Sequence, residues 1–407
     1  MHKTDADHQE HELRDILQEI KDYDLPNIEF KDIALNSKEL CQSDFLQVLK
    51  KYKQNRNNFI IIDVRSEKEY SADALPFSVN LPILNNTERH KVGLIYFKES
   101  KEKALSLAYY FAKKKEKSYI DNILKYTNGR KVIVYCWRGG ARSKYTAGIL
   151  QKNNVDVVRL QGGQKGFRKN VYDFLYNKTI PIISLSGITG CGKSEILEYI
   201  KEFQPDFPVL HLEECAGHAS SVFGEIRYAM RNQKKNNQKQ FETNIFMEVL
   251  PYINEEGILP VFLSESESKK IGGLTLPPAV QRGLEKEEHI CLTCPIEKRI
   301  ERLEKDYFAS ADSGNKKKSE SKEKIKEQLQ FLGNKLSKTK IEQYKEWIDN
   351  DQYSDFLKDI MENYYDKIYK SYKKEPLFVI NNQATGSTVK AIFEFWNIKI
   401  LQRNLLL

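Results

Sequence analysis

Runs of apolar residues mark the strands that we expect in the first half of the chain. Each run is short and apolar on both faces, which is typical of a strand buried in a parallel sheet. The runs are Phe59–Val64, Lys131–Cys136 and Val155–Leu160. Stretches in which apolar positions repeat with a helical period lie before and between them, at Asp44–Lys53, Ala104–Lys115 and Arg142–Lys152. Strands that alternate with helices at this spacing predict an α/β domain with a parallel sheet.

A second series of apolar runs indicates another α/β domain in the rest of the chain. Its expected strands are Ile180–Leu185, Val209–Leu212, Leu259–Leu263, His289–Leu292 and Pro376–Ile380. Between the last two lies a long segment, Ile296–Lys374, that is rich in lysine, poor in glycine and proline, and helical in period. The lysine run Lys316–Lys318 within it is most simply a solvated loop.

The length of the chain and the changes of pattern indicate the domain organisation. At about 150 residues per domain, 407 residues suggest two or three domains. Residues 1–40 are charged and lack a clear period, so we expect a helical arm or a partly disordered extension, and most simply a solvated tail. A first α/β domain is then expected at 41–175, and a second at 176–407 that includes the helical segment 296–374.

Composition excludes several classes of protein. No apolar run approaches the roughly 18 residues that a membrane-spanning helix needs, and the first 15 residues lack the apolar stretch of a secretory signal. Six irregularly spaced cysteines do not form a disulfide framework. We therefore expect a reduced, cytoplasmic protein without a membrane partner. The net charge of +8, from 65 basic and 57 acidic residues, permits a polyanionic partner such as RNA.

The strongest local chemistry follows the predicted strand that ends at Cys136. The loop and the first helical turn after it contain Trp137, Arg138, Gly139, Gly140 and Arg142. Backbone N–H groups of such a loop converge on one point, and the helix dipole adds positive potential there. These groups and the two guanidinium groups stabilise a thiolate. The loop is therefore expected to hold a nucleophilic sulfur with an anion beside it.

Two chemistries use such a cysteine loop, and the loop by itself does not separate them. A rhodanese-like domain carries sulfur or selenium on the cysteine, whereas a Cys-x5-Arg phosphatase forms a phosphocysteine clamped by the arginine. The upstream segment that contains Asp63 and Arg65, followed by Ala74–Pro76 and Asn80–Pro82, resembles the other rhodanese signature. Asp63 and Arg65 would tie loops together at the strand end. Both signatures occur in the right order, about 70 residues apart, which favours the rhodanese interpretation.

A phosphate-binding loop follows the predicted strand Ile180–Leu185. The segment Gly187–Ser194 matches the pattern G-x4-G-K-[ST], with a strand before it and helix-compatible sequence after it. Its expected contacts with phosphate come from Gly187, Thr189, Gly190, Gly192, Lys193 and Ser194, and the Ser194 hydroxyl could also hold Mg²⁺. No apolar run ends in the usual acidic partner, aspartate; the nearest strand ends in Glu265. A diphosphate ligand other than ATP therefore stays open.

A rhodanese-like domain followed by a P-loop domain resembles the tRNA 2-selenouridine synthase family, from about residue 42 to the C-terminus. The Cys-Trp-Arg-Gly-Gly loop at Cys136 is the most specific element of the resemblance. The other matching segments are Glu88–Arg89, Val92–Tyr96, Leu212–Glu213, Ala216–His218, Phe223–Gly224, Gln240–Glu242, Glu265–Ser268, Ile271–Gly272, Leu276–Pro277 and Tyr364–Tyr369. The resemblance implies a rhodanese-like parallel-sheet domain and a P-loop NTPase-like α/β domain.

The resemblance also implies an activity. Family members replace the sulfur of 2-thiouridine at the tRNA wobble position by selenium from selenophosphate, and attach a geranyl group from geranyl diphosphate to that sulfur. By this resemblance Cys136 would carry or deliver selenium, and Arg138 and Arg142 would hold selenophosphate. Lys193 and its loop would bind the diphosphate of the prenyl donor. The residue-based alternative is a rhodanese or phosphatase fused to a P-loop kinase or ATPase.

Several supporting residues have competing explanations. Glu213 and Glu265 are candidates to bind a metal or orient water, and His218 to contact phosphate, but each is also explained as a structural group. The chain has Ala219 where the family usually has an arginine, and Arg227 is a candidate substitute. The lone pair Cys291 and Cys294 has no second pair to complete a zinc site. We expect no zinc, haem or flavin. Three tyrosines at helical spacing, Tyr364, Tyr365 and Tyr369, are expected in the core.

Overall fold

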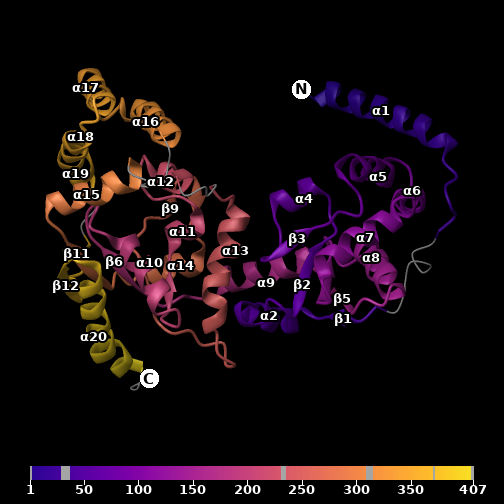
Figure 1. Cartoon of the computed structure of the whole chain (residues 1–407), viewed down its shortest axis with the longest axis horizontal. Coiled ribbons are helices and arrows are strands. Elements are labelled where there is room, and N and C mark those ends of the chain that lie inside the picture. The colour runs from indigo at the N-terminus through magenta and orange to yellow at the C-terminus, as the bar shows by residue number, and fades with distance from the viewer. Residues whose placement is uncertain (1, 29–36, 231–234, 309–314, 370–371, 405–407) are drawn as a thin grey trace. The chain divides into compact units, whose positions relative to one another are not determined.

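The computed structural model describes residues 2–28, 37–230, 235–308, 315–369 and 372–404. The chain divides into two compact units, the first ending at Asn170 and the second beginning at Val171. Each unit contains a five-stranded sheet, and several of the strands are labelled in Figure 1. All neighbouring strands in both five-stranded sheets are parallel. The predicted α/β class with parallel sheets is confirmed.

The sheet of the first unit has the strand order β1-β5-β4-β2-β3. Its strands are β1 (Glu39–Leu40), β2 (Phe59–Asp63), β3 (Ser78–Asn80), β4 (Lys131–Tyr135) and β5 (Val157–Leu160). The middle strands are buried because both of their faces are apolar, as in other parallel sheets. Asp63 pairs with Tyr135 in the register of β2 and β4. The segments that follow these two strands therefore meet at the same edge of the sheet.

Helices precede, connect and follow these strands, and the last of them ends beyond Asn170, in the second unit. They are α1 (His2–Glu19), α2 (Gln42–Lys50), α3 (Tyr52–Asn55), α4 (Glu67–Ala72), α5 (Asn86–Lys98), α6 (Lys101–Lys114), α7 (Glu116–Thr127), α8 (Ala141–Lys152) and α9 (Gly163–Asn177). Reciprocal side-chain bonds cap two of them: Ser66 and Glu69 cap α4, and Asn85 and Glu88 cap α5. These caps fix where each helix begins.

The N-terminal segment is not the solvated tail that its charge suggested. It forms α1, and Ile16 of this helix and Ile20 directly after it are buried with Ile95 of α5 and Leu107 of α6. Its Glu19 also forms an ion pair with Lys91. The expectation was wrong because a few apolar residues suffice to dock a helix that is otherwise charged. Residues 29–36, also part of the expected extension, lie outside the described residues.

The sheet of the second unit has the order β12-β11-β6-β8-β7. Its strands are β6 (Ile182–Ser186), β7 (Val209–Leu210), β8 (Phe262–Glu265), β11 (His289–Thr293) and β12 (Phe378–Asn381), and a small ribbon pairs β9 (Lys270–Ile271) with β10 (Leu274–Thr275). β8 begins after the predicted Leu259, because Pro260 has no N–H to give to a ladder. The strand β6 lies in the centre of the sheet, with β8 and β7 on one side and β11 and β12 on the other. The loop after β6 is therefore at the point where the strand order reverses, which is where such sheets bind ligands.

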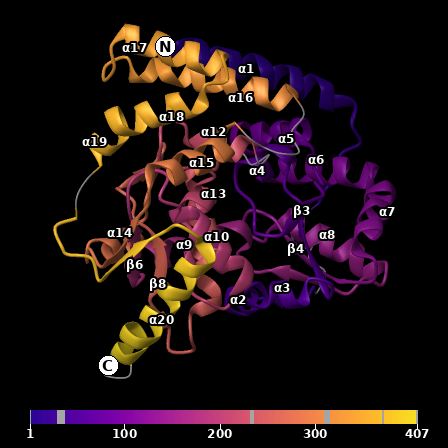
Figure 2. The same cartoon turned by 60° about the vertical axis from the view of Figure 1, so that its left-hand side comes forward.

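The predicted helical segment is present. It contains α15 (Ile296–Tyr307), α16 (Asn315–Leu329), α17 (Lys338–Asp349), α18 (Tyr353–Ile360) and α19 (Asp366–Ile368), drawn in orange to yellow in Figure 2. Leu303, Leu329, Ile348 and Phe356 belong to one buried apolar cluster within it. The run Lys316–Lys318 lies in helix α16 and not in the expected loop. The loop prediction for this run was wrong, because α16 begins at Asn315, before the lysines.

The remaining helices of the second unit surround its sheet. They are α10 (Lys193–Phe203), α11 (Leu212–Ala216), α12 (Gly224–Met230), α13 (Gln238–Val249), α14 (Pro278–Leu284) and α20 (Thr385–Asn404). Ile196 and Ile200 of α10 pack with Ile392 and Trp396 of α20 and with the strands in one apolar core. Within the described residues, no helix has the length and apolar character needed to cross a membrane.

Candidate functional site

The cysteine loop, residues 136–140, connects β4 to α8. Cys136 is only 3% exposed, and its Sγ lies 3.2 Å from the Ser143 hydroxyl oxygen in the first turn of α8. The sulfur therefore lies at the base of the loop, beside the N-terminus of a 12-residue helix. Trp137 and Arg138 are exposed on the same loop.

Neighbouring segments hold this loop by its carbonyl groups. The N–H of Gln164 donates to the Cys136 carbonyl at 3.0 Å, and the N–H of Lys165 donates to the Trp137 carbonyl at 2.9 Å. The Arg159 guanidinium donates to the Gly139 carbonyl and pairs with Glu39. Gly163 has φ +54°, and a Cβ there would lie 2.1 Å from the Cys136 carbonyl oxygen. Only glycine permits this close approach, so the loop has a defined shape.

Arg142 is not an isolated cation. Its Nη1 and Nη2 atoms donate to the two carboxylate oxygens of Glu69, at 2.6 and 3.0 Å, and Arg89 lies 3.7 Å from the same carboxylate. Burial raises the pKa of Glu69, but the hydrogen bonds and charge of Arg142 outweigh burial and lower the pKa to about 2. Glu69 therefore neutralises the positive charge of Arg142, and the two parallel hydrogen bonds fix the orientation of the guanidinium group.

Glu69 and Arg89 were not identified as site residues from the sequence. Glu69 is 73 residues from Arg142 along the chain. The only available signal was its place in the segment after Asp63, where an acid in a short helix has many ordinary explanations. Its second role is local, because its carboxylate accepts from the Ser66 N–H at the start of α4.

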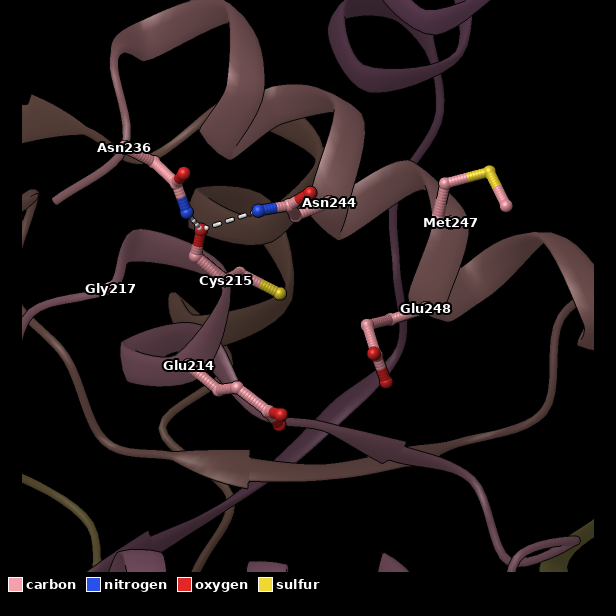
Figure 3. A pocket seen from close by; sticks show the side chains of 7 residues that line it. All are labelled: Glu214, Cys215, Gly217, Asn236, Asn244, Met247 and Glu248. Carbon is pink, nitrogen blue, oxygen red and sulfur yellow. Dashed lines mark hydrogen bonds between the residues drawn. The ribbon is translucent and has the colours of Figure 1, made fainter. Parts of the chain in front are cut away.

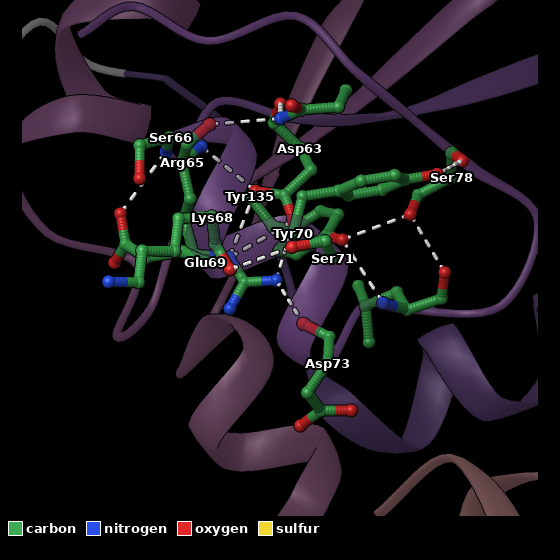
Figure 4. Close-up of polar contacts among 12 residues, drawn as sticks. Asp63, Arg65, Ser66, Lys68, Glu69, Tyr70, Ser71, Asp73, Ser78 and Tyr135 are labelled. Atoms are coloured by element: carbon green, nitrogen blue, oxygen red, sulfur yellow. Dashed lines mark hydrogen bonds and ion pairs between the residues drawn. The ribbon is translucent and has the colours of Figure 1, made fainter. Parts of the chain in front are cut away.

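Asp63 and Arg65 form a buried ion pair at the end of β2 (Figure 4). The Arg65 Nη2 atom donates to Asp63 at 2.6 Å and to the carbonyl of Asp73 at 2.6 Å. The side chain of Tyr135 lies beside them and its hydroxyl bonds to Ser78. The network joins the end of β2 to the turn after α4. It lies next to the cysteine loop, because Asp63 pairs with Tyr135, the residue before Cys136.

The phosphate loop, residues 187–192, connects the central strand β6 to α10. Gly187, Gly190 and Gly192 all have positive φ, and a Cβ at Gly187 would lie 2.5 Å from the Leu292 carbonyl oxygen. The Lys193 ammonium donates to the Gly187 carbonyl at 2.6 Å. The geometry is a strand, a tight glycine loop and a helix N-terminus, which is an anion-binding arrangement.

Helices far along the chain contribute groups to the phosphate loop. The Gly187 N–H donates to the hydroxyl of Tyr369 at 2.7 Å. Arg299 of α15 donates to the Thr189 carbonyl at 2.7 Å and holds both oxygens of Asp366, and Arg302 pairs with Glu195 of α10. None of these residues was expected at the loop, and Tyr369 does not lie in the core as expected, being 37% exposed.

A cluster of acids and one histidine lies next to the phosphate loop. The Glu213 carboxylate accepts from the Ser194 hydroxyl at 2.8 Å. His211 and Glu265 form a buried pair at 2.8 Å. Ligand atoms of His211, Glu213 and Glu265 all lie within 4.8 Å of one another. The arrangement brings the two predicted acids together at the end of β8 and the start of α11.

The histidine of this cluster carries a perturbed charge. Burial of His211 favours the neutral ring, but Glu265 and Glu214 outweigh it and raise the pKa to about 10. Nearby Glu267, whose carboxylate accepts from the Ser220 hydroxyl, has its pKa raised well above the usual range by burial and by Glu213. The cluster therefore combines a charged histidine with a carboxyl group that favours its protonated form.

His218 and Arg227 differ in what they can do. Arg227 is surrounded by Glu198, Asp306 and Glu213, with nitrogen-to-oxygen distances of 3.1, 3.4 and 3.7 Å. Its charge is therefore compensated, so it does not replace the arginine missing at Ala219. His218 is 7% exposed, and burial lowers the pKa of its ring. A neutral buried histidine is a weak partner for phosphate.

A separate pocket of about 370 Å³ lies between α11 and α13 (Figure 3). Its lining residues are Glu214, Cys215, Gly217, Asn236, Asn244, Met247 and Glu248. Asn236 and Asn244 both donate to the Cys215 carbonyl, at 2.9 and 3.0 Å. Lys201 joins the two carboxylates of Glu214 and Glu248. The pocket does not contain the predicted site residues.

Comparison with known proteins agrees with the two predicted types of domain. Residues 46–170 match the model of the rhodanese-like domain, and residues 180–396 match that of the tRNA 2-selenouridine synthase AAA domain. A curated tRNA 2-selenouridine synthase of Nitrosomonas eutropha is 31% identical over 62% of this chain and 64% of its own length. Those of Shewanella frigidimarina and Shewanella pealeana are 31% identical over 61% and 63% of this chain, and over 65% and 68% of theirs. The match thus spans less than two thirds of the first two relatives. Since the second model covers more than half of the 407 residues, the chain belongs to the tRNA 2-selenouridine synthase family.

Proposed function

We propose that the chain is a tRNA-modifying transferase that converts wobble 2-thiouridine to 2-selenouridine with selenophosphate. In the proposed route, S-geranyl-2-thiouridine made from geranyl diphosphate is the intermediate. The observation that carries the proposal is Cys136, recessed in a glycine loop with guanidinium groups beside it, in a chain of this family. A P-loop in the same chain supplies the second anion site that two phosphorylated substrates need.

Cys136 is proposed to assist the attack of selenophosphate, through its selenium, on C2 of the S-geranyl base. The C2–Se bond forms as the C2–S bond breaks and geranylthiol leaves, and water then cleaves the Se–P bond and releases phosphate, so that no oxidant is needed. Arg138 offers an exposed guanidinium, and Arg142 keeps N–H groups beyond the two that it gives to Glu69. Backbone N–H groups of the loop and of the first turn of α8 are proposed to complete the anion site. This set suits a small, highly charged anion such as a phosphate bearing selenium.

The phosphate loop is proposed to bind the diphosphate of the prenyl donor. Its N–H groups and the Lys193 ammonium stabilise the charge that develops on a departing diphosphate. For the donor to bind, Lys193 has to exchange its bond to the Gly187 carbonyl for one to phosphate. Arg299 and Arg302 hold the loop from the side of α15 through the Thr189 and Gly190 carbonyls, while Asp366 and Glu195 compensate their charges.

Mg²⁺ fits the residues around Ser194. The Ser194 hydroxyl and the Glu213 carboxylate are 2.8 Å apart, and hard oxygen donors of this kind are the ligands that Mg²⁺ prefers. When bound, Mg²⁺ would neutralise charge on the diphosphate. Glu265 is already committed to His211 and to the Leu212 N–H, so its role is to position the segment that carries Glu213.

A kinase or ATPase activity of the phosphate loop is the second candidate. The pairing of Ser194 with Glu213 favours it, because a magnesium nucleotide would use the same two groups. It predicts nucleotide turnover without tRNA. A competition titration would show whether geranyl diphosphate or ATP binds more tightly to the phosphate loop, because both ligands would need Lys193.

The test is nucleoside mass spectrometry on thiolated tRNA incubated with the protein. Four reactions are compared: no donor, selenophosphate alone, geranyl diphosphate alone, and both. We expect S-geranyl-2-thiouridine with geranyl diphosphate and 2-selenouridine when selenophosphate is added. Absence of both products with folded protein and authentic thiolated tRNA would refute the proposal, and ATP turnover in the same preparation would favour the second candidate.

A further inference from the structure

The side chain of Trp137 is partly exposed on the cysteine loop. Trp137 is 36% exposed although it directly follows Cys136, which is 3% exposed. Within the described part of the chain its ring takes part in no aromatic contact. A large aromatic side chain left at the mouth of a reactive loop is available for stacking.

The backbone of Trp137 is held firmly even though its side chain is exposed. The Lys165 N–H donates to its carbonyl, and the Gln164 N–H donates to the carbonyl of Cys136. Gly163 packs so closely on Cys136 that no side chain fits there. The ring is therefore carried on a rigid base, which lowers the entropy lost when a planar ligand stacks on it.

The charges beside the ring suit a nucleic-acid backbone. Arg138 and Lys165, the residues linked to Trp137 by sequence and by hydrogen bond, are both exposed. Among the described residues neither forms an ion pair, in contrast to Arg142, which is neutralised by Glu69. An aromatic platform with unpaired cations beside it is the arrangement that binds unstacked bases.

The recessed sulfur explains why such a platform would be needed. A base in a stacked strand cannot bring an atom of its ring to the sulfur of a residue that is 3% exposed. It has to leave its stack, and enzymes that act on bases replace the lost stacking with aromatic side chains. We propose that Trp137 stacks on the extruded target uracil of the RNA and thereby holds its C2 position over Cys136. This inference rests on the proposed function and makes Trp137 a positioning residue.

The test compares Trp137→Ala with an RNA that lacks the target base. An anticodon stem-loop with 2-thiouridine and the same stem-loop with an abasic wobble site are titrated against wild type and Trp137→Ala. We expect the alanine variant to bind the thiouridine RNA about 5- to 150-fold more weakly than wild type, because stacking on one base has that effect. With the abasic RNA the two proteins should bind equally. In turnover KM should rise more than kcat falls, and Trp137→Phe should recover most of the affinity.

Two controls keep the outcomes separate. Phe97→Ala removes an aromatic ring that is 82% exposed on α5 of the same unit and should leave both affinities unchanged. If Trp137→Ala weakens both RNAs equally, or neither, the stacking role is wrong. If wild type shows base-dependent binding through Trp137 but makes no modified nucleoside from the thiolated RNA and both donors, the proposed reaction fails while the stacking role stands.

Discussion

The cysteine loop and the phosphate loop have the same local plan and different surroundings. Each follows a buried parallel strand, turns through glycines and enters a helix by its N-terminus. At the cysteine loop the neighbouring groups bond to carbonyls, while exposed Arg138 has no ionic partner among the described residues. At the phosphate loop, the Lys193 cation bonds to a loop carbonyl and the first N–H donates to Tyr369.

This difference indicates how each loop would meet its anion. The cysteine loop presents a fixed surface, so a ligand binds to groups that already face it. The phosphate loop has to exchange internal hydrogen bonds for bonds to phosphate, and such exchange reduces the net gain from each new bond. We therefore expect variants of the cysteine loop to change mainly the rate of selenation, and variants of the phosphate loop to change mainly the affinity for the diphosphate donor.

The largest expected effect is at the cysteine loop. Cys136→Ala removes the catalytic thiol of the proposed step, so selenation should fall by at least about a thousandfold. RNA binding and geranylation should persist, because the phosphate loop is intact. Nucleoside mass spectrometry measures both products. Cys291→Ala, in strand β11, is the matched control and should remain active; selenation by Cys136→Ala at a normal rate would remove the sulfur from the mechanism.

The buried ion pairs of the two units should differ in their response to pH. His211→Gln leaves Glu265 buried without its partner and should lower the free energy of unfolding of the second unit by about 3–5 kcal/mol. The raised pKa of His211, about 10, means that the wild-type pair stabilises the fold below the ordinary histidine pKa, and that this stability is lost as pH rises through about 10.

Hydrogen exchange resolves the two units in one experiment. Between pH 7 and 10, after correction for intrinsic exchange, protection of β6 and β8 should decline more in wild type than in His211→Gln. Protection of β2 and β4 should respond less, because the pair of Asp63 with Arg65 keeps its guanidinium charged over that range. An equal decline in the variant would show that His211 is not the titrating group.

Lys193→Ala should weaken donor binding at the phosphate loop. A hydrogen bond to a charged group contributes about 1.5–3 kcal/mol, so the Kd of the diphosphate donor should rise about 10- to 150-fold. Selenophosphate binding at the cysteine loop should not change. Isothermal titration with each donor measures this, with Lys298→Ala as an exposed control on α15; an unchanged Kd for geranyl diphosphate would exclude the Lys193 role.

The smallest expected effect tests whether the phosphate loop exchanges an internal hydrogen bond for one to phosphate. Tyr369→Phe frees the Gly187 N–H from the tyrosine hydroxyl, so the donor should bind about fivefold more tightly. Tyr364→Phe, without a contact to the loop among the described residues, serves as the control. Weaker binding by Tyr369→Phe would instead show that the hydroxyl itself contacts the donor.

Much of the fold was predictable because strands of parallel sheets are apolar on both faces. The runs at Phe59 and Lys131 became β2 and β4 within one residue of their expected ends. A helical arm was considered for the segment of α1 but ranked below a solvated tail, because its apolar residues are few among many charges. Only the partner surface on α5 and α6 shows that they are buried. The lysine run was misjudged because helix α16 continues through it.

The sequence by itself determined the two loops, since a strand end, a glycine turn and a helix start are neighbours along the chain. Only the tertiary structure decided which distant groups meet them. Glu69 is 73 residues from Arg142, Arg299 is 110 from Thr189, and Tyr369 is 182 from Gly187. Parallel strands bring their carboxyl ends to one edge of a sheet, but which side chain reaches a given atom there depends on how the connecting helices pack. Local pattern therefore specifies the anion loops, and packing determines which charges remain available for a ligand.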